Sequence, residues 1–417
     1  MKVLIVNTSE KTGGAAIAAN RLTEALINNG VSAKMLVMEK ESDNIFVASI
    51  GGWLKKSWNF AFERLVIWVN NLFSRNNLFT VSIANTGIDI TKSTEFQEAD
   101  IIHLHWINQG FLSLRVIKKI LKSGKPVVWT MHDMWELTAI CHHAYECDRY
   151  ETECRECQFL RFPGKNDLAH RVFLKKIKAM EGKVTYVAVS KWLAERALRS
   201  KMVGKNVVKV IPNSISLSRF PIKDKIEARD HFNIGGNKKI VVFGAARIDA
   251  PIKGFEYLKQ ALRIIAERKP EMATDMLLMV FGGCKDETVL EDIAIQSVWL
   301  GKINGESELA KLYSAADVAV SSSLYETFGQ TLIEAQACGC MPVSFAGSGQ
   351  QDIIVHKHTG YLAEYKSAED LANGILWAFD AEVKRTELRK NVMKNFSQSV
   401  VANQYIKLYN EISGLQA

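Results

Sequence analysis

Short apolar runs alternate with longer stretches of mixed polarity along this chain. The first two runs cover residues 2–7 and 33–38, and the alanine-rich residues 15–29 lie between them and end at Gly30. A continuous apolar run of this length is typical of a strand in a parallel sheet, while the longer stretch suits a helix. The opening therefore predicts a strand, a glycine-containing loop, a helix and a second parallel strand.

The same alternation continues toward the end of the chain. Further strands are predicted at residues 100–104, 126–131, 185–189, 207–211, 239–243 and 317–321. Strands that alternate with helical stretches indicate an α/β fold with parallel sheets, and 417 residues exceed what one ordinary core holds. We therefore expect two domains, joined by a turn-rich linker at residues 212–237 that ends in Gly235 and Gly236.

The charge is uneven between the two halves. Residues 1–210 hold 30 Lys and Arg against 20 Asp and Glu, a net +10, so the other residues carry −2 of the total of +8. A basic half favours an acidic partner: nucleic acid, an anionic membrane surface or an anionic substrate. The N-terminal residues read as a strand rather than a signal peptide, and no run of 18 apolar residues occurs. We expect a cytoplasmic location, in which thiols stay reduced.

Two glutamates frame a glycine in the second half of the chain. Glu326 and Glu334 stand eight residues apart, and Gly329 lies between them, where the strand at residues 317–321 gives way to a predicted helix. A glycine lets the backbone approach a ligand closely, and the N–H groups at a helix start form an anion site. Most glutamates are solvated surface charges, so this pair gains meaning only from its neighbours.

A second strand end supplies positive charge. Arg247 and Lys253 follow the strand predicted at residues 239–243, and Gly254 opens the next helix. An arginine, a lysine and a helix N-terminus at the carboxyl ends of parallel strands predict a site for a diphosphate.

These motifs, in this order, resemble those of the family 4 glycosyltransferases, which are retaining, metal-independent enzymes of the GT-B architecture. The resemblance covers nearly the whole chain, and it includes residues 337–343 (ACGCMPV) and 358–362 (HTGYL). It implies an α/β fold of two Rossmann-like, doubly wound domains that face a deep cleft. The acceptor-side domain would be residues 1–211, the sugar-nucleotide domain residues 212–395, and residues 396–417 a helix that returns to the first domain.

The chain departs from the family in one place. Residues 212–216 read PNSIS, where the family often has P-N-G-x-D, so the geometry of the linker stays open.

The resemblance also implies a reaction. A hexose would pass from a nucleotide sugar to a hydroxyl of a glycan or lipid-linked glycan, in the synthesis of a surface polysaccharide, with neither a catalytic metal nor nucleic acid. Arg247 and Lys253 would hold the diphosphate, Glu334 the ribose and Glu326 the donor sugar. His132, after the strand at residues 126–131, would also contact that sugar, although a lone histidine there is more often structural. The other donor-binding residues would be Phe328, Gly329, Gln330, Thr331, Gly13 and Gly14.

Two other functions stay open at this point. A catalytically silent protein of the same fold could bind a sugar nucleotide or a partner, although the intact Arg247, Lys253, Glu326 and Glu334 argue against it. An oxidoreductase would need the G-x-G-x-x-G loop of dinucleotide-binding folds, and residues 8–14 (TSEKTGG) hold a single glycine pair.

Four of the seven cysteines lie close together, at Cys141, Cys147, Cys154 and Cys157. In a reducing compartment clustered thiols favour a structural zinc over disulfides, and the C-x2-C spacing of the last pair suits zinc. His142 and His143 could replace a cysteine as ligands. Unligated thiols or a redox pair are the alternatives. Such a site would organise an insert, residues 141–157, on the acceptor side and would not take part in catalysis.

Residues 53–79 combine aromatic, aliphatic and basic side chains. Helical spacing puts Trp58, Phe62, Leu65, Val69, Leu72 and Phe73 on one face, flanked by Lys55, Lys56, Arg64 and Arg75. Packing of that face against the protein's own core is the commoner arrangement. The alternative is an interfacial helix that enters an anionic membrane, with basic residues against the lipid phosphates.

Overall fold

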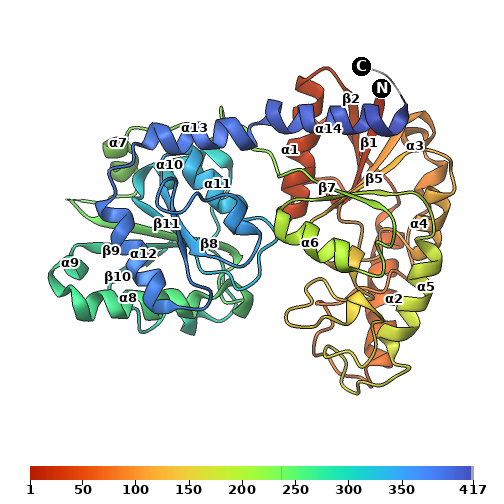
Figure 1. Cartoon of the computed structure of the whole chain (residues 1–417), viewed down its shortest axis with the longest axis horizontal. Helices are drawn as coiled ribbons and strands as arrows, with labels where there is room; N and C mark the ends of the chain where they lie inside the picture. The colour runs from red at the N-terminus through yellow and green to blue at the C-terminus, as the bar shows by residue number, and fades with distance from the viewer. Residues whose placement is uncertain (236, 415–417) are drawn as a thin grey trace. The chain divides into compact units, whose positions relative to one another are not determined.

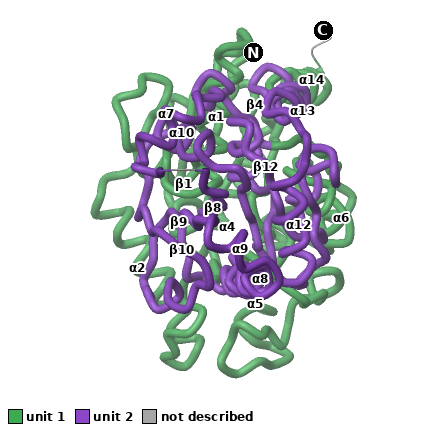
Figure 2. Tube along the Cα trace, turned by 90° about the vertical axis from the view of Figure 1, so that its left-hand side faces the viewer, with its two compact units in different colours: residues 1–212, 401–417 green, residues 213–400 purple. Residues whose placement is uncertain are grey.

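The computed structural model describes residues 1–235 and 237–414 (Figure 1). The described chain forms two compact units, which Figure 2 colours separately. Unit 1 is Met1–Pro212 together with the segment from Val401 onward, and unit 2 is Asn213–Val400. Each unit has a parallel sheet and a hydrophobic core of its own, which confirms the α/β fold with two Rossmann-like sheets.

The sheet of unit 1 has seven described strands in the order β3-β2-β1-β4-β5-β6-β7, all parallel. They are β1 (Lys2–Ser9), β2 (Ser32–Glu39), β3 (Val47–Ser49), β4 (Ile101–Leu104), β5 (Val127–Met131), β6 (Thr185–Ala188) and β7 (Val207–Val210). Every residue of β4, β5 and β6 is buried, because helices cover both faces of the sheet. The winding reverses between β1 and β4, which are neighbours in the sheet.

The helices of unit 1 are α1 (Gly14–Asn28), α2 (Trp53–Asn70), α3 (Thr94–Glu98), α4 (Leu114–Leu121), α5 (Leu168–Ala179), α6 (Lys191–Arg199) and α14 (Gln398–Ser413), with 3-10 turns η1 (Ile90–Lys92), η2 (Trp135–Leu137) and η3 (Arg149–Glu151). The final helix α14 packs into the unit 1 core, where Tyr405 and Tyr409 are buried with Ile5 and Val128.

The sheet of unit 2 has six described parallel strands in the order β10-β9-β8-β11-β12-β13. They are β8 (Lys239–Arg247), β9 (Met276–Gly283), β10 (Gln296–Trp299), β11 (Val318–Ser321), β12 (Met341–Phe345) and β13 (Tyr361–Ala363). Its helices are α7 (Lys225–His231), α8 (Phe255–Arg268), α9 (Pro270–Thr274), α10 (Glu306–Ala315), α11 (Gln330–Ala337), α12 (Ala368–Asp380) and α13 (Arg385–Phe396), with η4 (Pro251–Lys253), η5 (Glu287–Leu290) and η6 (Gly349–Asp352).

The expected turn-rich linker contains a helix. Asp224 caps α7 by accepting from the N–H groups of Ile226 and Glu227, and Arg229 ties α7 to Asp317 of unit 2 at 3.0 Å. This part of residues 212–237 therefore belongs to a folded unit. Gly236, where the predicted linker ends, lies outside the described residues.

The orientation of α2 corrects a second expectation. Trp58 and Leu65, predicted to pack against the core, are 67% and 50% exposed, whereas Glu63 and Arg64 are buried. The predicted apolar face is therefore the outer one. Within the described part of the chain, no helix combines the length and the hydropathy that a membrane crossing needs.

Candidate active site

β8 and β11 are neighbours in the sheet of unit 2, and their carboxyl ends adjoin where the order of the strands changes direction. From β8 the chain continues to β9 and β10 on one side, while β11 pairs with the other side of β8. In open parallel sheets a crevice forms at such a point, because the loops after the two strands turn to opposite faces. The predicted donor residues of unit 2 lie at the ends of these two strands or in the segments that follow them.

The end of β8 and the turn after it carry the two predicted cations. Arg247 is the last residue of the strand, not a loop residue as expected, and its guanidinium donates to both carboxylate oxygens of Asp249. Lys253 ends η4. Gly254 follows with φ 62°, and a Cβ at this position would lie 2.0 Å from the carbonyl oxygen of Ser322. Only glycine fits there, so η4 can pass close to the loop after β11.

Lys253 and Glu326 form an ion pair between the two loops. Nζ of Lys253 donates to Oε2 of Glu326 at 2.6 Å, and about a quarter of each side chain is exposed, 27% and 22%. The backbone of Glu326 is fixed independently, because its carbonyl oxygen accepts from the N–H of Gly349 at 2.8 Å. Gln350 binds the same region through the hydroxyl of Ser321 at 2.9 Å. Lys253 and Glu326, which are 73 residues apart in sequence, are thereby held together where both side chains stay partly exposed.

The loop after β11 leads directly into α11. Gly329 precedes the helix with φ 111°, and no side chain caps α11 there, because glycine has none. An anion-binding helix start requires first amides that no side chain caps. Gln330 and Thr331 of the first turn are half-buried, and Glu334, one turn further, is buried. Phe328 differs from the expectation of a ligand contact. The residue is 2% exposed and its ring packs edge-on against Phe396, so its side chain is covered by the protein.

The glycine loop of unit 1 lies after β1, beside the reversal of that sheet. Gly13 has φ 94° and α1 begins at Gly14. The carboxylate of Glu41 accepts from the amides of residues 11 and 12, at 2.9 and 3.0 Å. Glu10 is buried and accepts from the N–H of Glu41 at 2.7 Å. These two glutamates fix the glycine loop, and the sequence pattern did not indicate them.

Three histidines gather at the carboxyl ends of β4 and β5. Nδ1 of His105 lies 2.8 Å from Nε2 of His132, and the rings of His103 and His105 are 4.3 Å apart. Burial lowers the pKa of His132 to about 4 and that of His103 to about 3, and it also lowers the pKa of His105. All three rings are therefore neutral near pH 7. A neutral His132 can exchange a hydrogen bond with a sugar hydroxyl, and His105 orients its ring.

Asp133 organises the segment next to His132. Its Oδ2 accepts from Nε1 of Trp106 at 2.8 Å and lies 2.7 Å from Nδ1 of His142. Burial alone would raise the pKa of Asp133, but His142 and the hydrogen bonds lower it to about 2. Nε2 of His142 lies 3.0 Å from the hydroxyl of Ser82, so both ring nitrogens are occupied. As placed, His142 is therefore not available as a metal ligand.

The four clustered cysteines, Cys141, Cys147, Cys154 and Cys157, line one cavity of ≈ 20 Å³ in unit 1. Burial raises the pKa of Cys154 to about 11 and that of Cys157 to about 12, so these thiols stay protonated without a metal. Among the described residues, no group of three or more His, Cys, Asp or Glu side chains is arranged to hold a metal ion. Zinc at this cluster stays a prediction.

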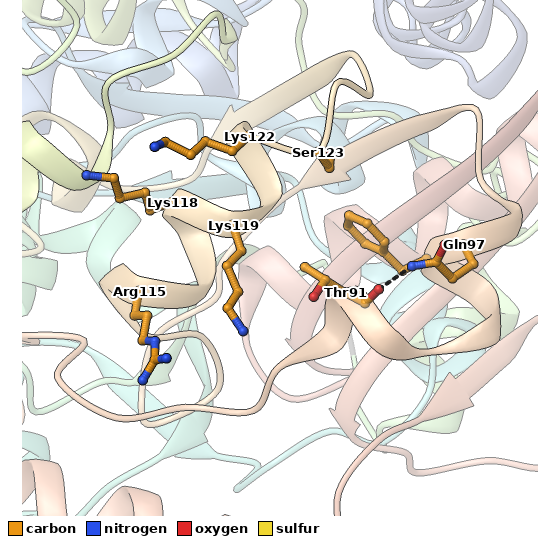
Figure 3. Close-up of a pocket in the computed structure, with 8 residues that line it drawn as sticks. Thr91, Gln97, Arg115, Lys118, Lys119, Lys122 and Ser123 are labelled. Atoms are coloured by element: carbon orange, nitrogen blue, oxygen red, sulfur yellow. Dashed lines mark hydrogen bonds between the residues drawn. The ribbon is translucent and has the colours of Figure 1, made fainter.

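A larger cavity, ≈ 570 Å³, lies beside α4 (Figure 3). Four of its lining residues are cations spaced along one face of the helix, Arg115, Lys118, Lys119 and Lys122. Phe96 and Ser123, which also line it, precede β4 and β5 in the chain. The cavity therefore lies toward the amino edge of the sheet, away from the histidines, and is separate from the candidate site.

Comparison with known proteins decides the family. The model of Glycosyltransferase Family 4 matches residues 12–219, and that of Glycosyl transferases group 1 matches residues 224–395. An uncharacterized glycosyltransferase of Methanocaldococcus jannaschii is 30% identical over 338 residues, which are 74% of this chain and 82% of the relative. The chain belongs to glycosyltransferase family 4. The resemblance inferred from the motifs is thereby confirmed.

Solved glycosyltransferase structures share the fold of this family 4 glycosyltransferase. Anabaena HepE in complex with UDP-glucose has a TM-score of 0.61 at 16% identity and covers 99% of this chain and 100% of its own. WaaG, a glycosyltransferase involved in lipopolysaccharide biosynthesis, has a TM-score of 0.60 at 15% identity and covers 99% of this chain and 100% of its own. At these identities the likeness supports the GT-B fold alone.

Proposed function

We propose that this glycosyltransferase moves a hexose from a nucleotide sugar to a hydroxyl of a glycan or lipid-linked glycan, with retention of configuration and without a catalytic metal. The ion pair of Lys253 with Glu326 carries the proposal. It fixes a cation suited to a leaving diphosphate 2.6 Å from a carboxylate suited to a sugar, next to the N-terminus of α11.

The leaving diphosphate gains negative charge as its bond to the sugar breaks. Lys253, Arg247 and the first amides of α11 would stabilise that charge. Carboxylates already pair with both cations, Lys253 through Glu326 and Arg247 through Asp249, and about half of the Arg247 side chain stays exposed to a donor. Lys253 and Arg247 would take the role that a metal ion has in other transferases, which is to stabilise the charge of the leaving diphosphate.

The sugar and the ribose would meet separate carboxylates. Glu326 would accept hydrogen bonds from the sugar and support positive character at its anomeric carbon, while Glu334 would accept from the ribose hydroxyls. His132, kept neutral by burial, would bond another hydroxyl of the sugar. Following the family, the acceptor hydroxyl attacks on the face from which the diphosphate leaves, and its proton passes to a phosphate oxygen. Configuration is then retained without an enzyme nucleophile.

The acceptor side of the proposal rests on charge and on the names of similar proteins. The net +10 of residues 1–210 suits an acceptor that carries phosphate, such as a lipid-linked glycan. HepE binds UDP-glucose, and WaaG acts in lipopolysaccharide biosynthesis, according to their descriptions. We therefore place the enzyme in surface polysaccharide synthesis at the cytoplasmic face of a membrane, with no role for nucleic acid.

The alternative is a catalytically silent protein of the same fold that binds a sugar nucleotide. A thermal-shift screen of sugar nucleotides and nucleoside diphosphates would find the donor, since a ligand at 100 times its Kd raises stability by about 2.7 kcal/mol. The best binder is then tested for release of nucleoside diphosphate with wild-type protein and with Lys253→Ala. Release that the variant loses supports the transferase, binding without release supports the silent protein, and no stabilisation by any donor rejects both.

A further inference from the structure

Helix α2 is attached to unit 1 by its polar side. Glu63 is fully buried, and its Oε1 accepts from the N–H groups of Ile83 and Ala84, both at 2.8 Å. Arg64 is also buried and donates to Glu63 at 2.8 Å and to the carbonyl oxygen of Val81 at 3.0 Å. Since buried charges persist only when they are paired and hydrogen-bonded, these contacts fix which side of α2 points inward.

Asn59 extends this attachment by one turn. Its amide donates to the carbonyl oxygen of Gly110 at 3.2 Å and accepts from the hydroxyl of Thr86 at 2.8 Å. The backbone at Gly110 also passes so close that a Cβ there would lie 2.8 Å from the backbone of Asn59. The register and rotation of α2 on unit 1 are therefore closely determined.

The opposite side of α2 is apolar and exposed. Leu54, Trp58, Phe62, Leu65 and Val69 follow one another at spacings of three and four residues, and they are 67%, 67%, 37%, 50% and 44% exposed. The rings of Trp58 and Phe62 stack at 6.0 Å. In a soluble protein, a helix normally packs such an apolar stripe against the core. An exposed stripe of this length therefore indicates a surface that binds another apolar surface or medium.

The exposed apolar surface continues past the end of the helix. Leu72 and Phe73 are 51% and 61% exposed, and both hold left-handed backbone conformations, φ 47° and 60°. Arg161 donates from its backbone N–H to Asn71 at 2.6 Å, which brings the exposed Phe162 to the same end of α2. A positive φ is energetically unfavourable for residues with bulky side chains. The contacts around this end of α2 therefore stabilise its backbone conformation.

Cations stand at both ends of this apolar surface, and no exposed acid lies on α2. Lys55 lies near the N-terminal end, and Arg75 and Arg161 lie near the other end, all exposed. Glu63 is the single acidic residue between Trp53 and Asn70, and it is buried. The charge around the stripe therefore suits an anionic partner.

We propose that α2 lies in the plane of an anionic bilayer, with its apolar side among the acyl chains and its terminal cations against the lipid phosphates. Aromatic and aliphatic side chains backed by cations are the features that such interfacial helices share. A second copy of this chain is a poorer occupant. Antiparallel pairing of two α2 helices would set Lys55 against Arg75 of the other copy, and parallel pairing would set like ends together, so like charges meet either way.

The inference deepens the proposed function, because a lipid-linked acceptor would be met at the membrane surface. Its test does not measure sugar transfer, so either proposal can fail without the other. The measurement is co-sedimentation of the full chain with vesicles of phosphatidylglycerol and phosphatidylcholine, and with vesicles of phosphatidylcholine alone. It is made at about 0.01 M and about 1 M salt, where the Debye length is about 30 Å and about 3 Å.

Wild-type protein should sediment with the anionic vesicles at low salt and less at high salt. Leu54→Ser with Trp58→Ser should lower the partition coefficient at least about tenfold, because the apolar part of the affinity is lost. Leu198→Ser is the matched control, since Leu198 on α6 is 68% exposed, as Leu54 is 67% exposed. It should leave binding unchanged. All three side chains are exposed, so the melting temperatures should stay at the wild-type value.

Three outcomes overturn the inference. Wild-type protein that stays in the supernatant with every vesicle at low salt removes the membrane. A dimer that forms without vesicles and is broken by Trp58→Ser makes the stripe an interface between copies. Binding that survives the α2 substitutions but is lost on Lys118→Glu with Lys122→Glu assigns the membrane contact to the cationic face of α4.

Discussion

Nζ of Lys253 lies 2.6 Å from Oε2 of Glu326, so each side chain neutralises a charge that would otherwise stand alone at the end of the sheet. Lys253→Ala should lower kcat/KM by roughly 100-fold, about 3 kcal/mol, because a fixed charge on the leaving group is lost. Lys269→Ala, at an exposed lysine of the same unit, is the control. Steady-state kinetics with the identified donor measures both, and wild-type rates for Lys253→Ala would place the diphosphate elsewhere.

The two glutamates should separate binding from turnover. Glu334→Gln replaces one oxygen of the buried carboxylate proposed for the ribose by an NH2 donor, so KM for the donor should rise while kcat changes little. Glu326→Gln removes the carboxylate proposed to act at the sugar, so kcat should fall, and Lys253 loses its charged partner. Separate determination of kcat and KM checks this division, and equal effects of the two substitutions on both constants would reject it.

Acid should destabilise unit 1 over a defined pH range. Burial lowers the pKa of His103 to about 3 and that of His132 to about 4, from an ordinary value of 6.5. Between pH 6.5 and pH 4 the unfolded chain therefore binds protons that the folded chain does not, and stability falls as the pH falls. Above pH 6.5 these groups are neutral in both states and contribute no pH dependence.

Thermal unfolding from pH 7.5 to pH 4.5 measures this effect. His103→Asn should reduce the slope of melting temperature against pH, and substitution of the exposed His358 by Gln should leave it unchanged. A wild-type melting temperature that does not fall below pH 6.5 would contradict the burial of neutral histidines.

The cysteine cluster has a direct test. If it binds zinc, protein purified under reducing conditions should contain about one zinc per chain, and a chelator should lower its melting temperature without changing donor binding. Cys157→Ser should lose the metal, whereas Cys284→Ser, at a cysteine outside the cluster, should keep it. Elemental analysis that finds no metal would leave the four thiols as unligated packing residues.

Apolar runs predicted β1, β2, β4, β5, β6, β8 and β11, because a strand buried on both faces is continuously apolar. The buried strands β9 and β12 were not predicted, although both are apolar runs of the same kind. Edge strands have no such constraint. β10 is exposed along its whole length, and β3 has three residues, so neither leaves a recognisable pattern. For α2 the sequence predicted the apolar face of the helix, but it did not predict that this face is exposed. The inward side depends on Glu63 bonding the amides of Ile83 and Ala84, which lie 20 and 21 residues further along the chain.

Site residues were predictable where a local motif carries them. Gly254 and Gly329 lie between a strand and a helix, as predicted, and both have positive φ. Pairings across the fold were not predictable, because spacing in sequence does not report which loops adjoin. Lys253 with Glu326 and His105 with His132 are such pairs. The burial of Phe328 was not predictable for a related reason, since Phe396, against which its ring packs, lies far along the chain.

Helix α14 gives the N-terminal unit a late folding step. Tyr409 and Thr130 bind the two ring nitrogens of His103 at 2.7 Å, and Tyr405 lies 2.9 Å from Thr130, so the last helix closes the core that β1 begins. During synthesis the ribosome must still produce all of Asn213–Val400 before this helix exists. At about 5–20 residues per second, unit 1 waits roughly 10–40 s with part of its core uncovered, and in that interval it is a natural client for chaperones.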